Sequence, residues 1–131
     1  MAQSFSSDIN LPEIVTEVTR AFQAYERALV SNDIAALNTM FWNSPLTLRY
    51  GTKELLYSHA EIARFRIERG PIDQRRTLRN TRITTFGRNF ATANTEYLPA
   101  NSDKIGRQSQ TWVRLSEGWK IVSAHVSLMA P

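Results

Sequence analysis

Arg49 lies in the middle of a short segment, Leu46-Thr-Leu-Arg-Tyr50, that has the composition of a buried β-strand. A lone guanidinium is too costly to bury, so it must pair with an internal carboxylate or bind an external anion. Glu54 is the nearest acid in the sequence, and Glu96 is the one acid within the later predicted strands. We expect pairing with Glu96 if Arg49 is structural, and an unpaired guanidinium if it binds a ligand.

Tyr25 is the second candidate for chemistry. It falls on an apolar stripe with helical spacing that also contains Ile14, Val18, Phe22 and Leu29. A buried tyrosine hydroxyl needs a hydrogen-bond partner. Two interpretations remain open: a core tyrosine bonded to a backbone carbonyl, or a hydroxyl that points into a cavity.

Polar side chains also occur on two strands near the end of the sequence. His125 and Ser127 share one face of the last predicted strand, because alternate residues of a strand point the same way. The preceding strand offers one polar set on each face: Gln108, Gln110 and Trp112, or Arg107, Ser109 and Thr111. Either set could line a pocket, and cross-strand hydrogen bonding on an exposed face is the alternative.

The reactive residue types exclude several chemistries. The chain has no cysteine and only two histidines, and no cluster of carboxylates accompanies the histidines. It has no glycine-rich phosphate loop, no nucleophile elbow and no close carboxylate pair. The remaining tyrosine, arginine, histidine, serine and glutamine can hold a small dianion and move a proton, so we expect no metal and no cofactor.

Basic residues are concentrated in one part of the chain. The net charge is +4, with 13 Arg to 3 Lys. Eight of the arginines lie between Arg64 and Arg88, offset by Glu68 and Asp73. We interpret this run as a solvated basic face. Nucleic-acid binding is disfavoured because few aromatic residues are interspersed in the arginine run and no known nucleic-acid-binding motif occurs. Steering of anionic substrates stays open.

The periodicity and turn residues predict the elements that position these side chains. Helices are expected at 12–30 and 33–42, and a third after the capping box Ser58-His-Ala-Glu61. Strands are expected at 46–50, 54–57, 77–86, 90–98, 105–115 and 119–128. Helices followed by a meander indicate an α+β domain over residues 10–131, after a loose tail at 1–9.

The expected shape is a cone in which a curved antiparallel sheet wraps around the long first helix. The helices cover only one face of the sheet, so the other face meets solvent or a second subunit. The last strand carries Val122, Ala124, Val126 and Leu128 on one face and Trp119 and Ile121 on the other. Apolar residues on both faces predict a homodimer through the outer sheet face.

No run of 18 apolar residues occurs, so we expect no membrane span. The first residues, MAQSFSSDIN, lack the charged start and apolar middle of a secretory signal. A cytoplasmic protein is the expectation.

Three segments carry a more specific resemblance: FWNSPLTLRYG at 41–51, GRQSQTW at 106–112 and GWKIVSAHVSLM at 118–129. They resemble the AtzH-like group, which includes the HpxZ proteins of oxalurate catabolism and has the SnoaL-like, cystatin-like cone fold. The similarity extends from Asn10 to Met129. The closing strand alone also resembles the association domain of calmodulin-dependent kinase II.

The resemblance implies an enzyme of ureide or cyanuric-acid breakdown that works beside an amidase. It implies a decarboxylating amidohydrolase that converts 1,3-dicarboxyurea to allophanate, with Tyr25 and Arg49 in the pocket. We predict that Tyr25, Arg49 and His125 are catalytic. Substrate contacts are predicted for Trp42, Gln108, Gln110 and Ser127.

Two alternatives to an enzyme remain. The same pocket could hold a small dicarboxylate or ureide without turnover and assist a partner amidase. The domain could instead serve only for dimerisation, in which case Arg49 should pair with Glu96.

Overall fold

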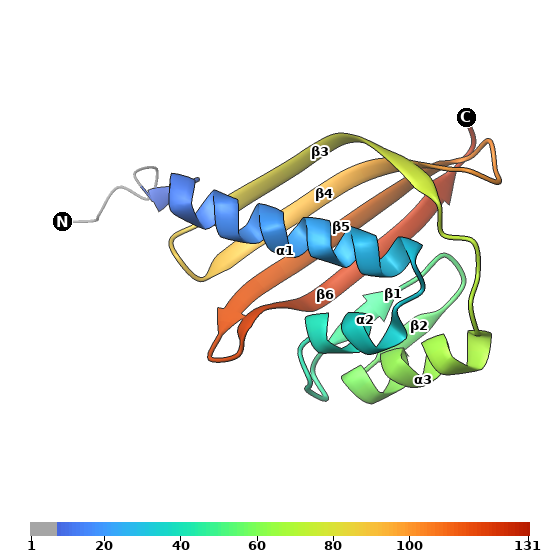
Figure 1. Ribbon diagram of the computed structural model, residues 1–131, viewed down its shortest axis with the longest axis horizontal. Helices are drawn as coiled ribbons and strands as arrows, with labels where there is room; N and C mark the ends of the chain where they lie inside the picture. Colours follow the sequence, from blue (N-terminus) through green and yellow to red (C-terminus); the bar gives the residue numbers. More distant parts are fainter. Residues whose placement is uncertain (1–7) are drawn as a thin grey trace.

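Helix α1 (Pro12–Val30) lies diagonally across one face of a six-stranded sheet (Figure 1). The structure is a computed structural model that describes residues 8–131. Pro12 occupies the first helical turn, where its missing N–H costs no hydrogen bond. The predicted stripe from Ile14 to Leu29 is confirmed, since all five of its side chains are buried against the sheet.

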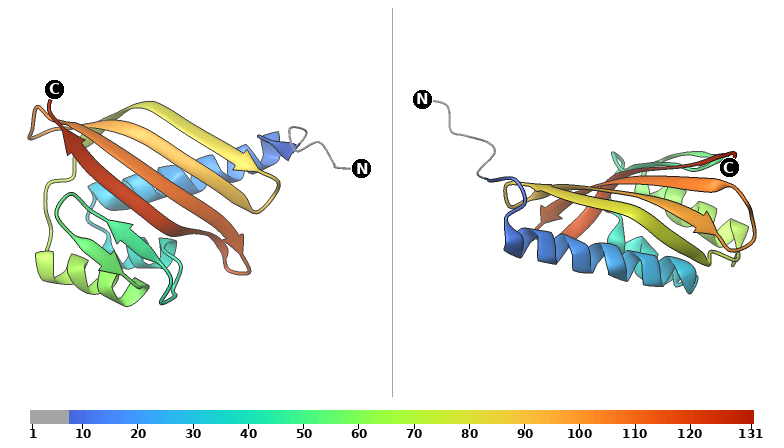
Figure 2. Two further views of the ribbon diagram at one scale, coloured as in Figure 1. Left: turned by 180° about the vertical axis from the view of Figure 1, so that it is seen from behind. Right: turned by 90° about the horizontal axis from the view of Figure 1, so that it is seen from above.

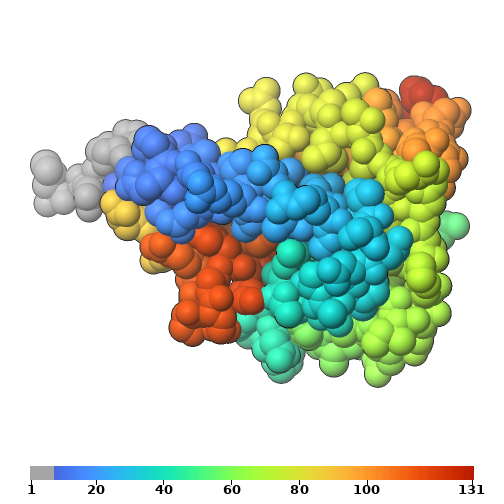
Figure 3. Space-filling model, in the orientation of Figure 1, coloured from blue at the N-terminus to red at the C-terminus, as the bar shows by residue number. Residues whose placement is uncertain are grey.

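Two shorter helices lie on the same side of the sheet as α1, beside its β1–β2 end (Figure 3). Helix α2 (Ile34–Met40) begins at Asp33, whose Oδ1 accepts the Ala36 N–H at 3.1 Å. Helix α3 (His59–Arg69) begins at Ser58, whose Oγ accepts the Glu61 N–H at 3.2 Å. Both caps are the ones that the sequence predicts.

The sheet has the strand order β2-β1-β6-β5-β4-β3. The last four strands in the chain form the predicted antiparallel meander: β3 (Arg76–Phe86), β4 (Phe90–Pro99), β5 (Ile105–Leu115) and β6 (Gly118–Met129). The hairpin of β1 (Leu48–Tyr50) and β2 (Leu55–Tyr57) extends the sheet, with β1 parallel to β6. A parallel pairing is possible here because α3 and the whole meander connect the two strands in the chain. The α+β cone fold is otherwise as predicted.

One extra residue in β6, Val122, interrupts its pairing with β5. This bulge shifts the alternation of the strand, so Ile121 and Ala124 are both buried on the helix side. Trp119 also faces the helices, because its Nε1 donates to Glu17 on α1 at 2.9 Å. The prediction that Trp119 and Ile121 lie on the opposite face of the strand from Ala124 is therefore wrong. The outer face of the sheet, which carries no helix (Figure 2), is less apolar than expected.

Residues 8–10, just before α1, are held against the end of β3. Ile9 forms an isolated antiparallel bridge with Phe86, and the Gly87 N–H donates to the Asp8 carbonyl at 3.0 Å. The predicted loose tail covered residues 1–9, and its first seven residues lie outside the described part of the chain. No helix within residues 8–131 is long and apolar enough to span a bilayer.

Candidate functional site

Arg49 projects from β1 toward the helices. Its register neighbours Leu56 on β2 and Ala124 on β6 are both buried on that side of the sheet. Only 11% of the Arg49 side chain is exposed, and Nη1 donates to Glu54 Oε1 at 3.3 Å. The Nε atom is buried and has no acceptor within residues 8–131. Arg49 is therefore half-paired, with one edge of the guanidinium left over.

The acid that reaches Arg49 is Glu54, on the turn between β1 and β2, and not Glu96. Glu96 accepts hydrogen bonds from Arg79 and Asn80 at 2.7 and 2.8 Å, and these contacts lower its pKa. Gly51 allows the Glu54 contact, because a side chain at Gly51 would collide with the Glu54 carboxylate. The expected pairing of Arg49 with Glu96 does not occur, but the guanidinium is not free either, because Glu54 forms an internal ion pair with it.

Tyr25 lies deeper in the molecule and is 2% exposed. Its ring meets the Phe41 ring edge-on, with 6.2 Å between centroids. The Arg66 guanidinium lies over the same Phe41 ring, 5.2 Å from its centroid. The Tyr25 hydroxyl is close enough to Arg66 to favour its charged form, although no hydrogen bond of normal geometry joins them. Phe41 thus holds Tyr25 and Arg66 together.

Arg66 is a buried cation on α3, with 3% of its surface exposed. Neither Nη1 nor Nη2 has a hydrogen-bond partner in the described part of the chain. Burial lowers its pKa, and the nearby Arg49 charge lowers it further. Stacking on Phe41 contributes about 0.5–2 kcal/mol, whereas burying a charge costs several kcal/mol. Among residues 8–131, no carboxylate forms an ion pair with this buried positive charge.

A cavity of about 210 Å³ opens in front of Arg49. Glu54, Arg69 and Tyr97 share its wall, and the segments around Asp73 and Ser102 form its rim. Burial lowers the pKa of Arg69 and raises that of Tyr97. The Arg66 and Arg49 charges lower the pKa of Arg69 further, so the three guanidinium groups are close enough to repel one another. The surroundings favour an anion.

Glu26, Arg76 and Gln108 form a closed network between α1 and the sheet. Arg76 donates to both carboxylate oxygens of Glu26 at 2.8 Å and to Gln108 Oε1 at 2.7 Å. Gln108 Nε2 completes the ring by donating to Glu26 at 3.0 Å. Arg76 also stacks 4.4 Å from the Tyr97 ring, which lies against Gly106 where a side chain would not fit. Gln108 is therefore committed to this network.

Gln110 is the other inward-facing glutamine of β5. Its Oε1 accepts Trp112 Nε1–H at 3.0 Å, and its buried Nε2 has no acceptor among residues 8–131. The helix-side set of β5 is thus Gln108, Gln110 and Trp112, which selects one of the two sets that the sequence left open.

The structure does not bring His125 and Ser127 to Arg49 and Tyr25. His125 is exposed on the outer face, edge-on to Tyr50 with 5.6 Å between ring centroids. Ser127 is on the same face and accepts Arg107 Nε–H at 3.0 Å. Their shared face follows from the strand alternation as predicted, but that face is the one without helices.

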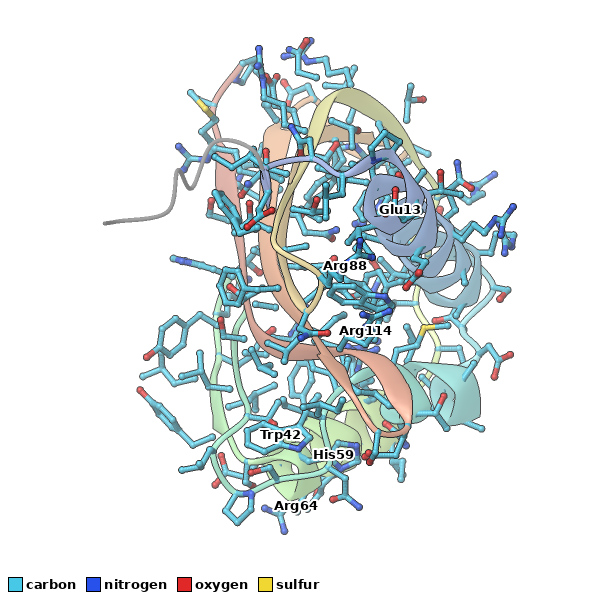
Figure 4. The ribbon with its side chains drawn as sticks, turned by 90° about the vertical axis from the view of Figure 1, so that its left-hand side faces the viewer. Glu13, Trp42, His59, Arg64, Arg88 and Arg114 are labelled. Carbon is cyan, nitrogen blue, oxygen red and sulfur yellow. The ribbon has the colours of Figure 1, made fainter. Side chains whose placement is uncertain are left out.

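Trp42 also lies away from the arginine pocket. It follows the core residue Phe41 in an extended stretch, so its side chain points the other way. Figure 4 shows it at the same end of the molecule as His59 and Arg64. Its backbone N–H donates to Ile121 at 2.9 Å, and its carbonyl accepts the Thr47 hydroxyl at 2.7 Å. A substrate contact for Trp42 stays a prediction.

Sequence reasoning missed Arg66 and Arg69. Both lie on the inward stripe of α3, one and two turns beyond the buried Ile62. A polar residue at helical spacing from buried apolar residues is the signal that identifies Tyr25 on α1. The same signal exists for Arg66 and Arg69 on α3, but the many neighbouring arginines obscured it. Such a cluster can grip a carboxylate bidentately. Residues 8–131 contain no group of three His, Cys, Asp or Glu that could hold a metal.

Comparison with solved structures supports the architecture. A protein of unknown function from the DUF3225 family of Pectobacterium atrosepticum is 50% identical, over 95% of this chain and 97% of its own, with a TM-score of 0.92. A cystatin-like fold protein from Burkholderia xenovorans is 49% identical, over 94% and 97%, with a TM-score of 0.90. An NTF2-like superfamily protein from Salmonella enterica is 23% identical, over 91% and 93%, at a TM-score of 0.72, and shows the fold alone.

A search of curated proteins found no match. The family model described as AtzH-like matches residues 7–131, which contain every element and every pocket residue described above. The chain therefore belongs to the AtzH-like family.

Proposed function

We propose that the protein is a cofactor-free enzyme that removes a carboxyl group from a small carboxylated urea, such as 1,3-dicarboxyurea, to give allophanate. The observation that carries the proposal is Arg49, whose buried Nε has no acceptor in the described residues although Glu54 occupies Nη1. Family membership supports it, because the AtzH-like resemblance implies this reaction with Tyr25 and Arg49 in the pocket.

In the proposed reaction Arg49 binds one substrate carboxylate through parallel N–H donors. The C–N bond to the departing carboxyl group breaks, and its electron pair stays on nitrogen while carbon dioxide leaves. The Tyr25 hydroxyl delivers a proton to that nitrogen, and water then returns a proton to Tyr25. The sum is one dicarboxyurea dianion and one proton giving one allophanate anion and carbon dioxide.

The surroundings of Tyr25 suit such a step. The Tyr25 ring packs edge-on against Phe41 and its hydroxyl is buried near the Arg66 charge, so the donor is fixed before substrate arrives. Positioning of the donor and exclusion of water from the site both favour proton transfer to the substrate. Because carbamate carboxyl groups are labile, no strong nucleophile is required.

The test is turnover of 1,3-dicarboxyurea by the full chain, with allophanate followed by mass spectrometry. Wild type and Arg64→Met, which changes an exposed arginine of α3, should both accelerate product formation. Arg49→Met and Tyr25→Phe should lose the acceleration while keeping their circular dichroism spectra. No acceleration by wild type over buffer would end the enzyme proposal.

The second candidate is a protein that binds a dicarboxylate without turnover and assists a partner amidase. The position of His125 on the outer face favours it, because the pocket then lacks the predicted second proton donor. Malonate binding that depends on Arg49, together with no turnover, is the outcome expected for this candidate. The homodimer and the amidase partner stay predictions.

A further inference from the structure

We infer that Arg66 binds a second anionic group of the ligand, beside the group held by Arg49, and so selects dianions over monoanions. This inference rests on the proposed function, because it assigns the other end of the same ligand. It adds a specificity-determining residue on α3 that sequence reasoning did not identify.

The first support is the state of the Arg66 side chain. Only 3% of the Arg66 surface is exposed. In the described residues, both Nη atoms lack acceptors and no ion pair includes Arg66. Arg76, the other deeply buried arginine, is treated differently, since Glu26 and Gln108 occupy its donors. The fold can therefore pair a buried arginine, and it does not pair Arg66.

The second support is the position of Arg66 relative to the other charges. It lies close enough to both Arg49 and Tyr25 to interact with them, and Tyr25 and Arg66 both contact the Phe41 ring. Glu54 reaches Arg49 from the β1–β2 turn but makes no ion pair with Arg66. Arg49 lines the cavity, whereas Arg66 is outside its wall but close enough for the two charges to interact, and the carboxylate present serves only Arg49. A ligand with two anionic groups would balance both.

The ligand class follows from this arrangement. It must be small and carry two carboxylates, with a polar group between them that can meet the Tyr25 hydroxyl. Glu54 must move aside or share Arg49 when the first carboxylate arrives. Arg66 would then act on affinity for the second group, whereas Arg49 acts on affinity for any carboxylate.

The experiment measures dissociation constants of malonate and of malonamate, its half-amide, by calorimetry. Wild type should bind the dianion malonate at least ten-fold more tightly than the monoanion malonamate. Arg66→Met should bring the ratio close to one, mainly by weakening malonate. Arg64→Met, on the exposed side of the same helix, should keep the wild-type ratio.

A second readout separates this role from a structural one. If Arg66 only supports the fold, Arg66→Met should melt at a lower temperature without ligand. If Arg66 instead binds a ligand anion, removing its unpaired buried charge should leave the melting temperature of the ligand-free protein unchanged or raise it. Should Arg66→Met fail to fold, Arg66→Lys serves instead, and it should keep the charge but lose part of the preference for malonate.

The outcomes distinguish this inference from the proposed function. A wild-type preference for malonate that survives in Arg66→Met overturns the inference. If wild type binds both ligands equally and depends on Arg49, the inference fails and the proposed function stands. If wild type binds neither ligand and turns over no substrate, both fail.

Discussion

Arg49 Nη1 lies 3.3 Å from Glu54 Oε1, while Nε of the same guanidinium is buried without an acceptor in residues 8–131. Glu54 thus occupies one edge of the group and leaves the other for a ligand. The Glu54 carboxylate competes with an incoming anion for the Arg49 guanidinium, so Glu54 lowers the affinity of Arg49 for a ligand.

Glu54→Gln should therefore increase the affinity for small carboxylates. The amide keeps the shape of the side chain but no longer competes as an anion. We expect malonate to bind about five-fold more tightly, which corresponds to roughly 1 kcal/mol for a partly exposed pair. Calorimetry measures the change. Glu68→Gln, an exposed change of the same charge on α3, is the control. An equal gain in this control would assign the effect to net charge and contradict the specific role of Glu54.

Tyr25→Phe should separate catalysis from binding. The ring still packs on Phe41, so loss of the hydroxyl should cost about 1 kcal/mol of stability or less. A missing proton donor should lower kcat by about 10²–10⁴. Malonate affinity should change by less than about three-fold, since Arg49 and Arg66 remain. Kinetics and chemical denaturation give both numbers, and Tyr50→Phe on the outer face is the matched control. Full activity in Tyr25→Phe would exclude the proton-donor role.

The fold followed from the sequence because its signals are local. Asp33 and Ser58 cap helices where predicted, and the turn around Gly87 joins two strands of the expected length. Spacing alone also identified the inward position of Tyr25. These features depend on neighbours in the chain, so no knowledge of the tertiary structure was needed.

The faces of the last strand and the partners of the charges could not be predicted in the same way. The bulge at Val122 reverses the inward–outward alternation of side chains along β6, and no local sequence pattern predicts an unpaired residue there. Glu54 reaches Arg49 through a turn beside Gly51, whereas Glu96 is on the other face. Within the arginine run, Arg76 is paired and Arg66 is not, and only packing decides which is which.

The Glu26–Arg76 pair should be the strongest single ionic contribution to stability among those described. Arg76 is 5% and Glu26 12% exposed, so Glu26→Ala would leave a buried charge unpaired at a cost of about 3–5 kcal/mol. The double variant Glu26→Leu with Arg76→Met should recover most of this loss. Urea denaturation measures the differences.

The exposed pair of Arg79 and Glu96 is the control for this prediction, since solvent screens it and Glu96→Ala should cost far less stability than Glu26→Ala. Equal losses in the buried and exposed pairs would contradict the prediction, and so would a double variant less stable than Glu26→Ala.

Asp73 at the rim of the pocket should titrate at unusually low pH. Hydrogen bonds from the Arg75 side chain and backbone lower its pKa from 3.8 to about 2. Because the folded state favours the ionised form, this contribution to stability is complete above the ordinary pKa and is lost as the pH falls toward 2. NMR of the side-chain carboxyl carbon measures the midpoint directly.

Arg75→Gln is the matched variant for Asp73, because it removes the side-chain ion pair and keeps the backbone N–H bond. Its Asp73 midpoint should rise part of the way toward 3.8. A wild-type midpoint near 3.8 would show that the contact does not persist in solution. With the low midpoint, Asp73 stays negative at any pH used for activity, so the rim opposes anions that the three arginines behind it attract. Asp73→Asn should then speed the association of malonate, and the gain should shrink as salt screens the charge.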